Sequence, residues 1–307
     1  MGKITVIGSF VMDMVATVTE FPKAGQTVLG KTLRVYPGGK GANQAVAARR
    51  AGAEVEMIGC VGNDGNGKTF LELMKAEGIN TEHVKISETP TSIAQIQINE
   101  EGENKIVVIP SANHEYTPND LKEAEEAVKN SDLVMMQLEL RYEVSVAILE
   151  MCRKLKKKVI LNPAPGVKLD EEILKLATYI TPNETELEIL TGMKTESEEE
   201  LYKAAEKLLS MGVECVIATL GKRGAMIADK NGKRIIEGYK ATAVDTVGAG
   251  DCFNGAFAKC IAEGKTVEEA VRYANAAGAL SVMKKGAIPS LPYAEETISF
   301  MRDMNNT

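Results

Sequence analysis

A regular alternation of strand-like and helix-like segments from residue 117 onward constrains this chain more than any other feature. Short apolar runs at 133–138, 159–162 and 216–219 are typical of buried strands, and helical patterns separate these runs from one another. Parallel strands need such helical crossovers, and the helices then cover both faces of the sheet. The sequence therefore predicts an α/β fold in three layers, with a mostly parallel sheet between two layers of helices.

The helices of this region are marked by capping signals. Thr117 is followed by a proline, and Ser197 and Thr266 each stand three residues before a glutamate, which is the capping-box pattern. Such caps satisfy the first backbone N–H groups of a helix, so they show where each helix begins. The predicted helices cover residues 117–130, 143–156, 183–192 and 197–211, and a long alanine-rich helix follows from 266.

The N-terminal part of the chain contains β-rich segments that do not fit this alternation. Residues 12–36 and 92–110 alternate apolar and polar side chains around turn signals, which is typical of half-exposed strands. We predict that they form a small β-sheet lid inserted into a single domain that spans residues 1–307. Further signals predict strands at 4–7 and 55–61 and helices at 42–51 and 68–77.

Composition and charge argue against several classes of function. The chain carries a net charge of −7 without a basic cluster, which argues against a nucleic-acid partner or an anionic membrane surface. Its five cysteines show no C-x-x-C spacing and only two histidines are present, so we expect no zinc site and reduced thiols in the cytoplasm. No apolar stretch is long enough to span a membrane, and the first apolar run is too short for a signal peptide.

One glycine-rich turn combines an anion site with a carboxylate. An apolar lead-in from Ala243 runs into Gly248-Ala-Gly250, and a helical pattern begins at Asp251. Glycines let successive backbone N–H groups turn toward one point at the positive end of a helix, where Asp251 would accept a proton. This pairing suits phosphoryl transfer to a hydroxyl group. The alternative is an ordinary N-capping aspartate after a glycine-rich loop.

A second stretch matches a different phosphate-binding motif. Residues 62–69, Gly-Asn-Asp-Gly-Asn-Gly-Lys-Thr, fit the P-loop pattern G-x-x-x-x-G-K-T between a predicted strand and a predicted helix. Glu139, after the strand at 133–138, would be the partner carboxylate of a P-loop phosphotransferase. The alternative is a Gly/Asn-rich turn with Lys68 at the solvated start of a helix.

Several motifs occur along the chain in one order and with wide spacing. They are Gly8-Ser9 with Asp13, Gly38-Gly-Lys-Gly-Ala-Asn43, Asn183-Glu-Thr-Glu186, Thr219-Leu-Gly-Lys-Arg-Gly224 and Gly248-Ala-Gly-Asp251. Together they resemble the ribokinase (PfkB-type) family of carbohydrate and nucleoside kinases over essentially the whole chain. The run of residues 38–44, which contains a lysine, is more similar to the ribose-specific branch than to the fructokinase or adenosine kinase branches. Under this resemblance, residues 62–67 are a structural turn.

The resemblance implies an ATP-dependent kinase that transfers the γ-phosphate to the 5-hydroxyl of a pentose, D-ribose by default. Asp251 would be the general base, and the amides of residues 248–250 (Gly248, Ala249 and Gly250) would form the anion hole. Polyols need many polar partners, because each buried hydroxyl requires a hydrogen bond. The implied sugar-binding residues are Asp13, Gly39, Lys40, Asn43, Glu139 and Asp251.

The same resemblance implies sites for ATP, Mg²⁺ and K⁺. Asn183 and Glu186 would face the phosphates and a hydrated Mg²⁺. The residues implied at the nucleotide site are Thr219, Leu220, Gly221, Lys222, Arg223, Gly224, Gly250 and Asn275. Those implied to form a loop for a monovalent cation, K⁺, mostly through backbone carbonyls, are Asp245, Val247, Ser281, Lys284, Gly286 and Ser290.

One position departs from the family pattern. The ribose kinases of the family have Gly-Ser-x-Asn-x-Asp after the first strand, whereas here Val11 replaces the sugar-contacting amide before Asp13. 2-Deoxyribose, another sugar or a nucleoside therefore stay open as substrates beside ribose. A non-catalytic sugar sensor is a rival function, although a pure binder has no use for the base Asp251. Lids of this family often clasp in a dimer, so we expect a homodimer through the small sheet.

Overall fold

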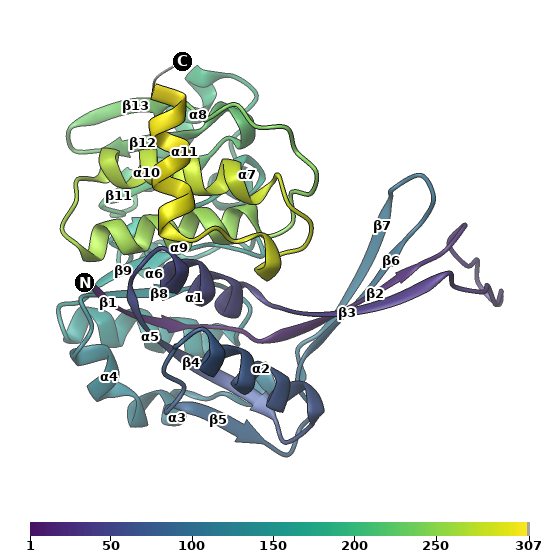
Figure 1. Cartoon of the computed structure of the whole chain (residues 1–307). Helices are drawn as coiled ribbons and strands as arrows, with labels where there is room; N and C mark the ends of the chain where they lie inside the picture. Colours follow the sequence, from purple (N-terminus) through teal and green to yellow (C-terminus); the bar gives the residue numbers. More distant parts are fainter. Residues whose placement is uncertain (306–307) are drawn as a thin grey trace.

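The computed structural model describes residues 1–305 and places them in a three-layer body from which a small sheet projects (Figure 1). Within these residues, nine strands form the central sheet in the order β13-β12-β11-β10-β9-β8-β1-β4-β5. Four further strands form the small sheet in the order β3-β2-β6-β7. The predicted α/β fold with an added small sheet is confirmed. No helix in the described part of the chain is long and apolar enough to cross a membrane.

The central sheet is parallel from β5 through to β11, and an antiparallel hairpin completes one edge. The hairpin turns at Lys230-Asn231, between the paired residues Asp229 and Gly232. The strands of the sheet are β1 (Lys3–Ile7), β4 (Glu54–Gly62), β5 (Val84–Ser87), β8 (Leu133–Met136), β9 (Lys158–Leu161), β10 (Tyr179–Ile180), β11 (Cys215–Thr219), β12 (Ala225–Asp229) and β13 (Gly232–Ile236).

Helices cover both faces of the central sheet. One face carries α1 (Lys40–Arg50), α2 (Gly65–Ala76), α9 (Ala249–Ala262), α10 (Val267–Ser281) and α11 (Ala294–Asn305). The other carries α3 (Pro118–Glu123), α4 (Glu125–Lys129), α5 (Tyr142–Lys154), α6 (Glu171–Leu174), α7 (Glu184–Thr191) and α8 (Glu198–Ser210). The described residues also form short 3₁₀ turns at η1 (Ser111–Glu115), η2 (Gly221–Arg223) and η3 (Ile288–Ser290).

Two apolar cores result from this layering. Successive side chains of a strand point to opposite faces of its sheet. Val6 of β1 therefore lies in the core shared with α1, α9 and α10, whereas the next residue, Ile7, lies in the core shared with α5, α7 and α8. The carboxyl ends of the parallel strands meet at one edge between these cores, and the polar residues that follow the strands gather there.

The small sheet extends away from the body and carries few buried side chains. It contains β2 (Val11–Thr17), β3 (Thr32–Gly38), β6 (Ile93–Ile98) and β7 (Asn104–Ile109), and Figure 1 shows it projecting from the body beside α1 and α2. All six residues of β7 are exposed. The predicted segments 12–36 and 92–110 do form this sheet, but residues 18–31, between β2 and β3, are not part of a strand.

Some predicted element boundaries are wrong. The helix predicted at 117–130 is interrupted at Ala124, so that it forms α3 and α4. The helix predicted from residue 68 begins at Gly65, because the Asp64 side chain caps it by accepting a hydrogen bond from the Gly67 backbone N–H. The sequence analysis missed β5, β10, α6 and α11. Of these, β10 and α6 are too short to show a periodic pattern.

Candidate active site

The N-terminal turn of α9 lies at the carboxyl edge of the central sheet. Gly248 begins it with a φ of 78°, which favours glycine, and an added Cβ there would make a tight contact of 3.1 Å with Ala287. The helix begins at Ala249, and Asp251 lies within its first turn. Gly248 is the N-cap residue and Asp251 is not, so the alternative interpretation of Asp251 as an N-cap is wrong.

The Asp251 carboxylate is buried and held by two amide side chains. Only 8% of the residue is exposed. Asn43 Nδ2 donates to Asp251 Oδ2 at 2.8 Å, and Gln44 Nε2 donates to Asp251 Oδ1 at 2.9 Å. Burial raises the pKa of Asp251, while Lys40 and these two donors oppose that increase. A buried carboxylate with fixed geometry and a raised pKa is suited to accept a proton.

Four carboxylates act electrostatically on Lys40. Burial disfavours its charged form, but Asp251, Glu139, Glu186 and Asp13 outweigh this effect and raise the pKa of Lys40. Burial, with a contribution from Glu139, raises the pKa of Asp13 to about 6, although Lys40 opposes the shift. Burial also raises the pKa of Glu186. The structure thus brings together charged residues that are distant in sequence, as the resemblance implies.

The turn into α1 is built around Glu139. Its carboxylate accepts hydrogen bonds from the Ser9 hydroxyl and, at 3.0 Å, from the Lys40 backbone N–H. Gly39 is the N-cap residue of α1, and the Gly41 backbone N–H donates to Ser9 Oγ at 3.2 Å. Glu139 therefore fixes the start of the helix that carries Asn43. Glu139 thus has a structural role at the start of α1 in addition to its place beside Lys40.

Asn43 presents an acceptor that no residue of the described chain satisfies. The residue is 6% exposed, and its Oδ1 has no hydrogen-bond partner. An unpaired polar atom that is buried costs about 1–3 kcal/mol, so such atoms usually have a partner. Since Asn43 Nδ2 is bonded to Asp251, the free Oδ1 lies beside the carboxylate and would accept a ligand hydroxyl.

Val11 and Asp13 belong to the same face of β2. Residues two apart in a strand share a face, and Asp13 faces Lys40 and Glu139. Val11 is 4% exposed. Val11, the apolar residue that departs from the family pattern, therefore lies on the same face of β2 as the charged residue Asp13.

A cavity of about 290 Å³ adjoins the first turn of α9. Of the residues implied at the nucleotide site, it is lined by Thr219, Gly221, Lys222, Gly224, Gly250 and Asn275. The sequence analysis missed Tyr239, Ala241, Ala243, Phe253, Ala279 and Val282, which also line it. The small residues of α10 (Ala276-Ala-Gly-Ala279) were a usable signal, since they leave room beside a helix.

Three residues implied at this nucleotide site have contacts elsewhere. Leu220 is buried in the core beside α8, so only its backbone is available. Arg223 NH2 forms an ion pair with Glu184 Oε1 at 2.5 Å. Asn275 Nδ2 donates to the backbone oxygens of Ile236 and Glu237 at 3.0 and 3.2 Å, which ties α10 to the end of β13.

Asn183 and Glu186 form the capping box of α7. Asn183 Oδ1 accepts from the Glu186 N–H at 2.8 Å, and Glu186 Oε2 accepts from the Asn183 N–H at 2.9 Å. Asn183 is therefore the N-cap residue of α7. This role does not separate Glu186 from the site, because the pKa of Glu186 responds to Lys40 and Asp251.

The residues implied at the monovalent-cation site lie in two loops that Asp245 joins. Asp245 Oδ1 accepts from the Val247 N–H at 3.0 Å, and Asp245 Oδ2 accepts from the Gly286 N–H at 2.9 Å. The second loop follows Ser281 and is closed by Ser290 Oγ, which donates to Ala287 O at 2.8 Å. The Lys284 side chain is paired with Glu296 at 2.8 Å, so only its backbone is available to a cation.

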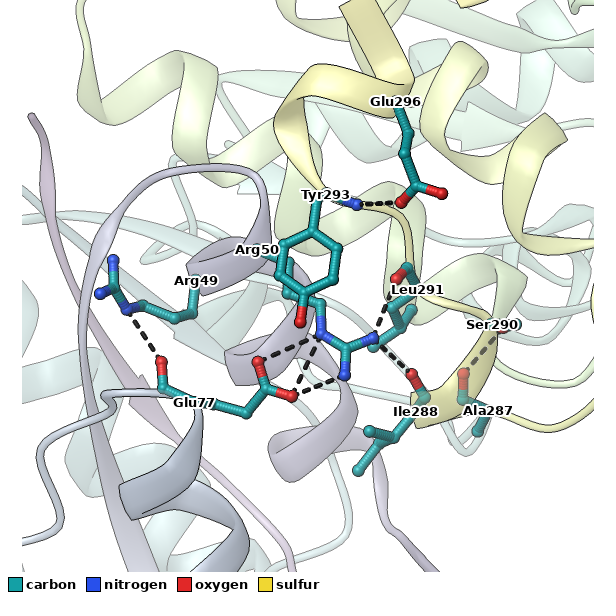
Figure 2. A network of polar contacts seen from close by, with 9 residues as sticks. All are labelled: Arg49, Arg50, Glu77, Ala287, Ile288, Ser290, Leu291, Tyr293 and Glu296. Atoms are coloured by element: carbon teal, nitrogen blue, oxygen red, sulfur yellow. Dashed lines mark hydrogen bonds and ion pairs between the residues drawn. The ribbon is translucent and has the colours of Figure 1, made fainter.

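Arg50, at the end of α1, holds this second loop from behind (Figure 2). Its NH1 group donates to Ile288 O and Leu291 O, both at 2.9 Å, and its Nε and NH2 groups pair with Glu77. The guanidinium also lies 5.0 Å from the centre of the Tyr293 ring. The same helix thus carries Lys40, Asn43 and Gln44 at its start and supports the loop against Gly248 at its end.

The apparent P-loop has a structural role. Asp64 accepts hydrogen bonds from the Gly67 N–H, the Thr91 N–H and the Thr91 hydroxyl, and Gly62 N donates to Thr91 Oγ1. A phosphate-binding loop must direct its backbone N–H groups to the ligand, whereas here the Gly67 N–H already donates to the Asp64 carboxylate. Lys68 is 77% exposed and lies near Glu72. The P-loop interpretation is therefore wrong.

Within residues 1–305, no group of three or more His, Cys, Asp or Glu side chains is placed to hold a metal ion. The donor sets described above fit ions held in other ways. Mg²⁺ at kinase sites is bound through one or two carboxylates and substrate phosphates, and a loop rich in carbonyl groups suits a monovalent cation.

Comparisons with known proteins show which family the chain is similar to. Residues 1–294 match the model of the pfkB family of carbohydrate kinases. The chain is 42% identical to the ribokinase of Haemophilus influenzae over 299 residues, which covers 97% of this chain and 98% of that protein. It is 36% identical to the deoxyribokinase of Salmonella typhi over 295 residues, 95% of this chain and 96% of that protein.

A solved structure shows the same architecture. The ribokinase of Arabidopsis thaliana, complexed with ribose and ATP, superposes with a TM-score of 0.94 and 31% identity, covering 98% of this chain and 99% of that one. The family model and the relatives each extend over almost the whole sequence. The chain therefore belongs to the pfkB family of carbohydrate kinases.

Proposed function

We propose that this protein is an ATP-dependent sugar kinase that transfers the γ-phosphate of ATP to the 5-hydroxyl of D-ribose. The observation that carries the proposal is the position of Asp251. Its buried carboxylate lies beside the polar cluster around Lys40, and the preceding residue, Gly250, lines the adjoining cavity. A base placed between a polyol site and a nucleotide site fits phosphoryl transfer between the two. The ribokinase relatives support ribose as the acceptor.

In this mechanism the protein positions two substrates and moves one proton. The oxygen of the 5-hydroxyl attacks the γ-phosphorus while the Asp251 carboxylate accepts the hydroxyl proton, and the bond from the γ-phosphorus to the departing ADP breaks. The backbone N–H groups of residues 248–250 stabilise the charge that develops on the transferred phosphoryl group. Asp13, Asn43 and Glu139 hold the other hydroxyls, with Lys40 and the Gly39 backbone beside them. A pure sugar sensor would not need a base at this position.

The nucleotide lies in the cavity beside α9 and α10 in this proposal. Its adenine and ribose contact the apolar and small side chains of the lining, and its phosphates extend toward Gly250. Asn183 and Glu186 would hold Mg²⁺ together with the phosphates, and the bound ion would supply positive charge against the phosphate oxygens. Carbonyl groups of the loops at 245–247 and 281–290 would hold K⁺ and so fix the backbone next to Gly248. Equal rates in K⁺ and in tetramethylammonium, at saturating Mg²⁺, would contradict the K⁺ site.

2-Deoxyribose is a second candidate acceptor, and Val11 is the observation that favours it. An apolar side chain on the sugar-facing row of β2 offers no hydrogen bond to a hydroxyl. 2-Deoxyribose has hydrogen in place of one hydroxyl, so at this position it would leave no hydroxyl without a hydrogen-bond partner. The similarity to a deoxyribokinase at 36% identity supports keeping this candidate.

The small sheet would act as a lid over the sugar, and its exposed apolar strands would pair with those of a second copy to form a homodimer. The net charge of −7 and the lack of a basic cluster favour a protein without nucleic-acid or membrane partners. Five buried, free cysteines are in keeping with the reducing cytoplasm.

The test of the proposed function is sugar-dependent ADP formation over a panel of pentoses, hexoses and nucleosides, with the product identified by ³¹P NMR. We expect ribose and 2-deoxyribose to give turnover and a phosphate ester at the 5-position. If no sugar stimulates ADP formation, or if a hexose or a nucleoside is strongly preferred, the assignment fails.

A further inference from the structure

A continuous chain of buried side chains connects the Asp251 carboxylate to the backbone of the anion hole. Gln44 Nε2 donates both to Asp251 Oδ1 at 2.9 Å and to Asn162 Oδ1 at 3.0 Å. Asn162 Nδ2 donates to Thr181 O at 3.0 Å, and the Thr181 hydroxyl donates to Asn254 Oδ1 at 2.6 Å. Asn254 Nδ2 then donates to Gly250 O at 2.8 Å, which returns the chain to the residue before Asp251.

The participants come from separate elements but meet at one edge of the sheet. Asn162 and Thr181 each directly follow a parallel strand, β9 and β10, while Gln44 belongs to α1 and Asn254 to α9. Each of the four is at most 6% exposed. Polar groups buried to this degree lie in a low dielectric, where each hydrogen bond is strong and a missing one is costly.

Gln137, which follows β8, fixes the direction of the Gln44 amide. Its Nε2 donates to Gln44 Oε1 at 2.7 Å. The Gln44 oxygen is therefore engaged on one side, and its NH₂ group must face Asp251 and Asn162. A reversed amide would bring the Gln44 oxygen against the Asp251 carboxylate and place two donors together at Gln137, so both contacts would become repulsive.

This orientation leaves one buried acceptor without a partner. Gln137 is 1% exposed, and its Oε1 has no hydrogen-bond partner in the described chain. The oxygen lies against Gly8, where an added Cβ would be only 2.1 Å away. An unsatisfied buried oxygen lowers stability, and an apolar side chain of the same size would avoid that cost. The pair is thus better explained by what it does to Asp251 than by stability.

We propose that Gln44 is a positioning residue for catalysis: held in one orientation by Gln137, it fixes the Asp251 carboxylate relative to the acceptor hydroxyl and the anion hole. The proposal rests on the proposed function, because Asp251 must be the base of that reaction. In that reaction Gln44 contacts neither the sugar nor ATP. Its loss would therefore lower kcat much more than it changes either KM.

The effect on pH dependence has a definite sign. Gln44 donates to the charged form of Asp251 and so lowers its pKa. Without this donor the pKa of Asp251 rises, and the loss of activity on acidification begins at a higher pH. The other charged groups that act on Asp251 are Lys40, Glu139, Asp13 and Glu186, and the substitution of Gln44 removes none of these charges.

The first experiment compares the wild-type protein with Gln44→Met, which keeps the length of the side chain and removes the amide. We expect kcat to fall tenfold or more, both KM values to change less than threefold, and the acid limb of kcat/KM to move up by about one pH unit. A folded Gln44→Met protein with wild-type kcat and an unmoved acid limb overturns the proposal. Wild-type protein without ribose turnover would instead refute the proposed function.

A second variant covers the case in which Gln44→Met does not fold. Gln137→Met leaves Gln44 in place but removes both the orienting donor and the unsatisfied oxygen. We expect little change in thermal stability, because the Gln44 oxygen loses its donor as the unpaired Gln137 oxygen is removed, together with a lower kcat and a smaller upward move of the acid limb. A Gln137→Met protein that loses stability but keeps kcat shows a purely structural amide pair and overturns the proposal.

Thr191→Val is the matched control. Thr191 is 3% exposed, and its hydroxyl donates to Leu187 O at the far end of α7, so its loss should leave kcat and the pH profile unchanged.

NMR of the wild-type protein is a measurement that needs no variant. The chain has five glutamines, so selective ¹⁵N labelling resolves their side chains. The Gln44 NH₂ signal should titrate with the midpoint of the acid limb; a signal that does not titrate there contradicts the proposal.

Discussion

Asp251 shows how one residue gains reactivity from its surroundings. Burial favours its protonated form, whereas Lys40, Asn43 and Gln44 favour the carboxylate. The carboxylate therefore stays available as a proton acceptor while its basicity is raised by its buried position. The nearby Asp13, with a pKa of about 6, has a similar environment but lacks the two amide donors.

Substrate choice is the prediction that belongs to Val11. Val11→Asn restores an amide on the sugar-facing row of β2, so a ribose hydroxyl without a partner gains one, worth about 1–3 kcal/mol. We expect the kcat/KM ratio of ribose to 2-deoxyribose to rise about tenfold or more. Val11→Thr, which adds a single hydroxyl at nearly constant shape, should move the ratio in the same direction by less. If the wild type strongly prefers ribose and Val11→Asn leaves the ratio unchanged, Val11 does not face the sugar.

Sequence reasoning identified single residues when a motif carried them and missed those that only the fold brings together. Asp251, Lys40 and Glu186 belong to motifs, and the structure places them close to one another. Gln44 lies next to Asn43, but its contacts with Asp251 and Gln137 depend on how α1 and β8 meet. Such contacts have no local pattern, so one sequence could not predict them.

At the scale of elements, α1 joins the two halves of the site. Its first turns carry Lys40, Asn43 and Gln44, and its last residue, Arg50, bonds the loop that lies behind Gly248. A rigid helix transmits position between its ends better than a loop does.

We predict that Arg50→Met destabilises the protein by about 3 kcal/mol, because Glu77 loses its partner in a largely buried pair and two loop carbonyls lose their donor. The measurement is thermal unfolding together with hydrogen exchange of residues 286–291, which should become faster. Arg49→Met is the matched control, since Arg49 bonds Glu77 O and Ala53 O but not the loop. Equal exchange rates in the two variants would contradict the role of Arg50.

The P-loop match illustrates why an element needs more than its local sequence. Residues 62–69 have the motif, the preceding strand and the following helix, yet Asp64 uses the turn to bind Thr91. Thr91 lies outside the motif, on the connection from β5 to β6. The contact between Asp64 and Thr91 therefore decides that an N–H group of this turn binds a side chain and not a phosphate.

At the scale of the whole molecule, the projecting sheet exposes apolar side chains on both edge strands. Leu33 of β3 is 67% exposed, and Ile106 and Val108 of β7 are 54% and 53% exposed. Exposed apolar edges of this kind pair with another chain or aggregate. The proposed homodimer would cover them.

We expect sedimentation analysis to find a dimer at micromolar concentration and the double variant Ile106→Lys/Val108→Lys to be a folded monomer. Charges on an edge strand oppose pairing between strands. Ile86→Lys, at a 58% exposed position of the central sheet, should stay dimeric. A monomeric wild type, or a double variant that remains a dimer, would count against the lid interface.

The layered body could be predicted from sequence because periodic segments and caps are local signals. The strand–helix alternation from residue 117 gave the parallel sheet, and the β-rich segments gave the small sheet. The break at Ala124, the two-residue β10 and the start of α2 could not be placed, since tertiary contacts and very short elements set them.

The most direct test of the central claim is the kcat of Asp251→Asn at saturating ribose and ATP. Asparagine keeps the size of the side chain but cannot accept the proton of the 5-hydroxyl. We predict a folded protein that binds nucleotide like the wild type and turns over about 10²–10⁴-fold more slowly. A folded Asp251→Asn protein with a kcat within about twofold of wild type would contradict the assignment of Asp251 as the base.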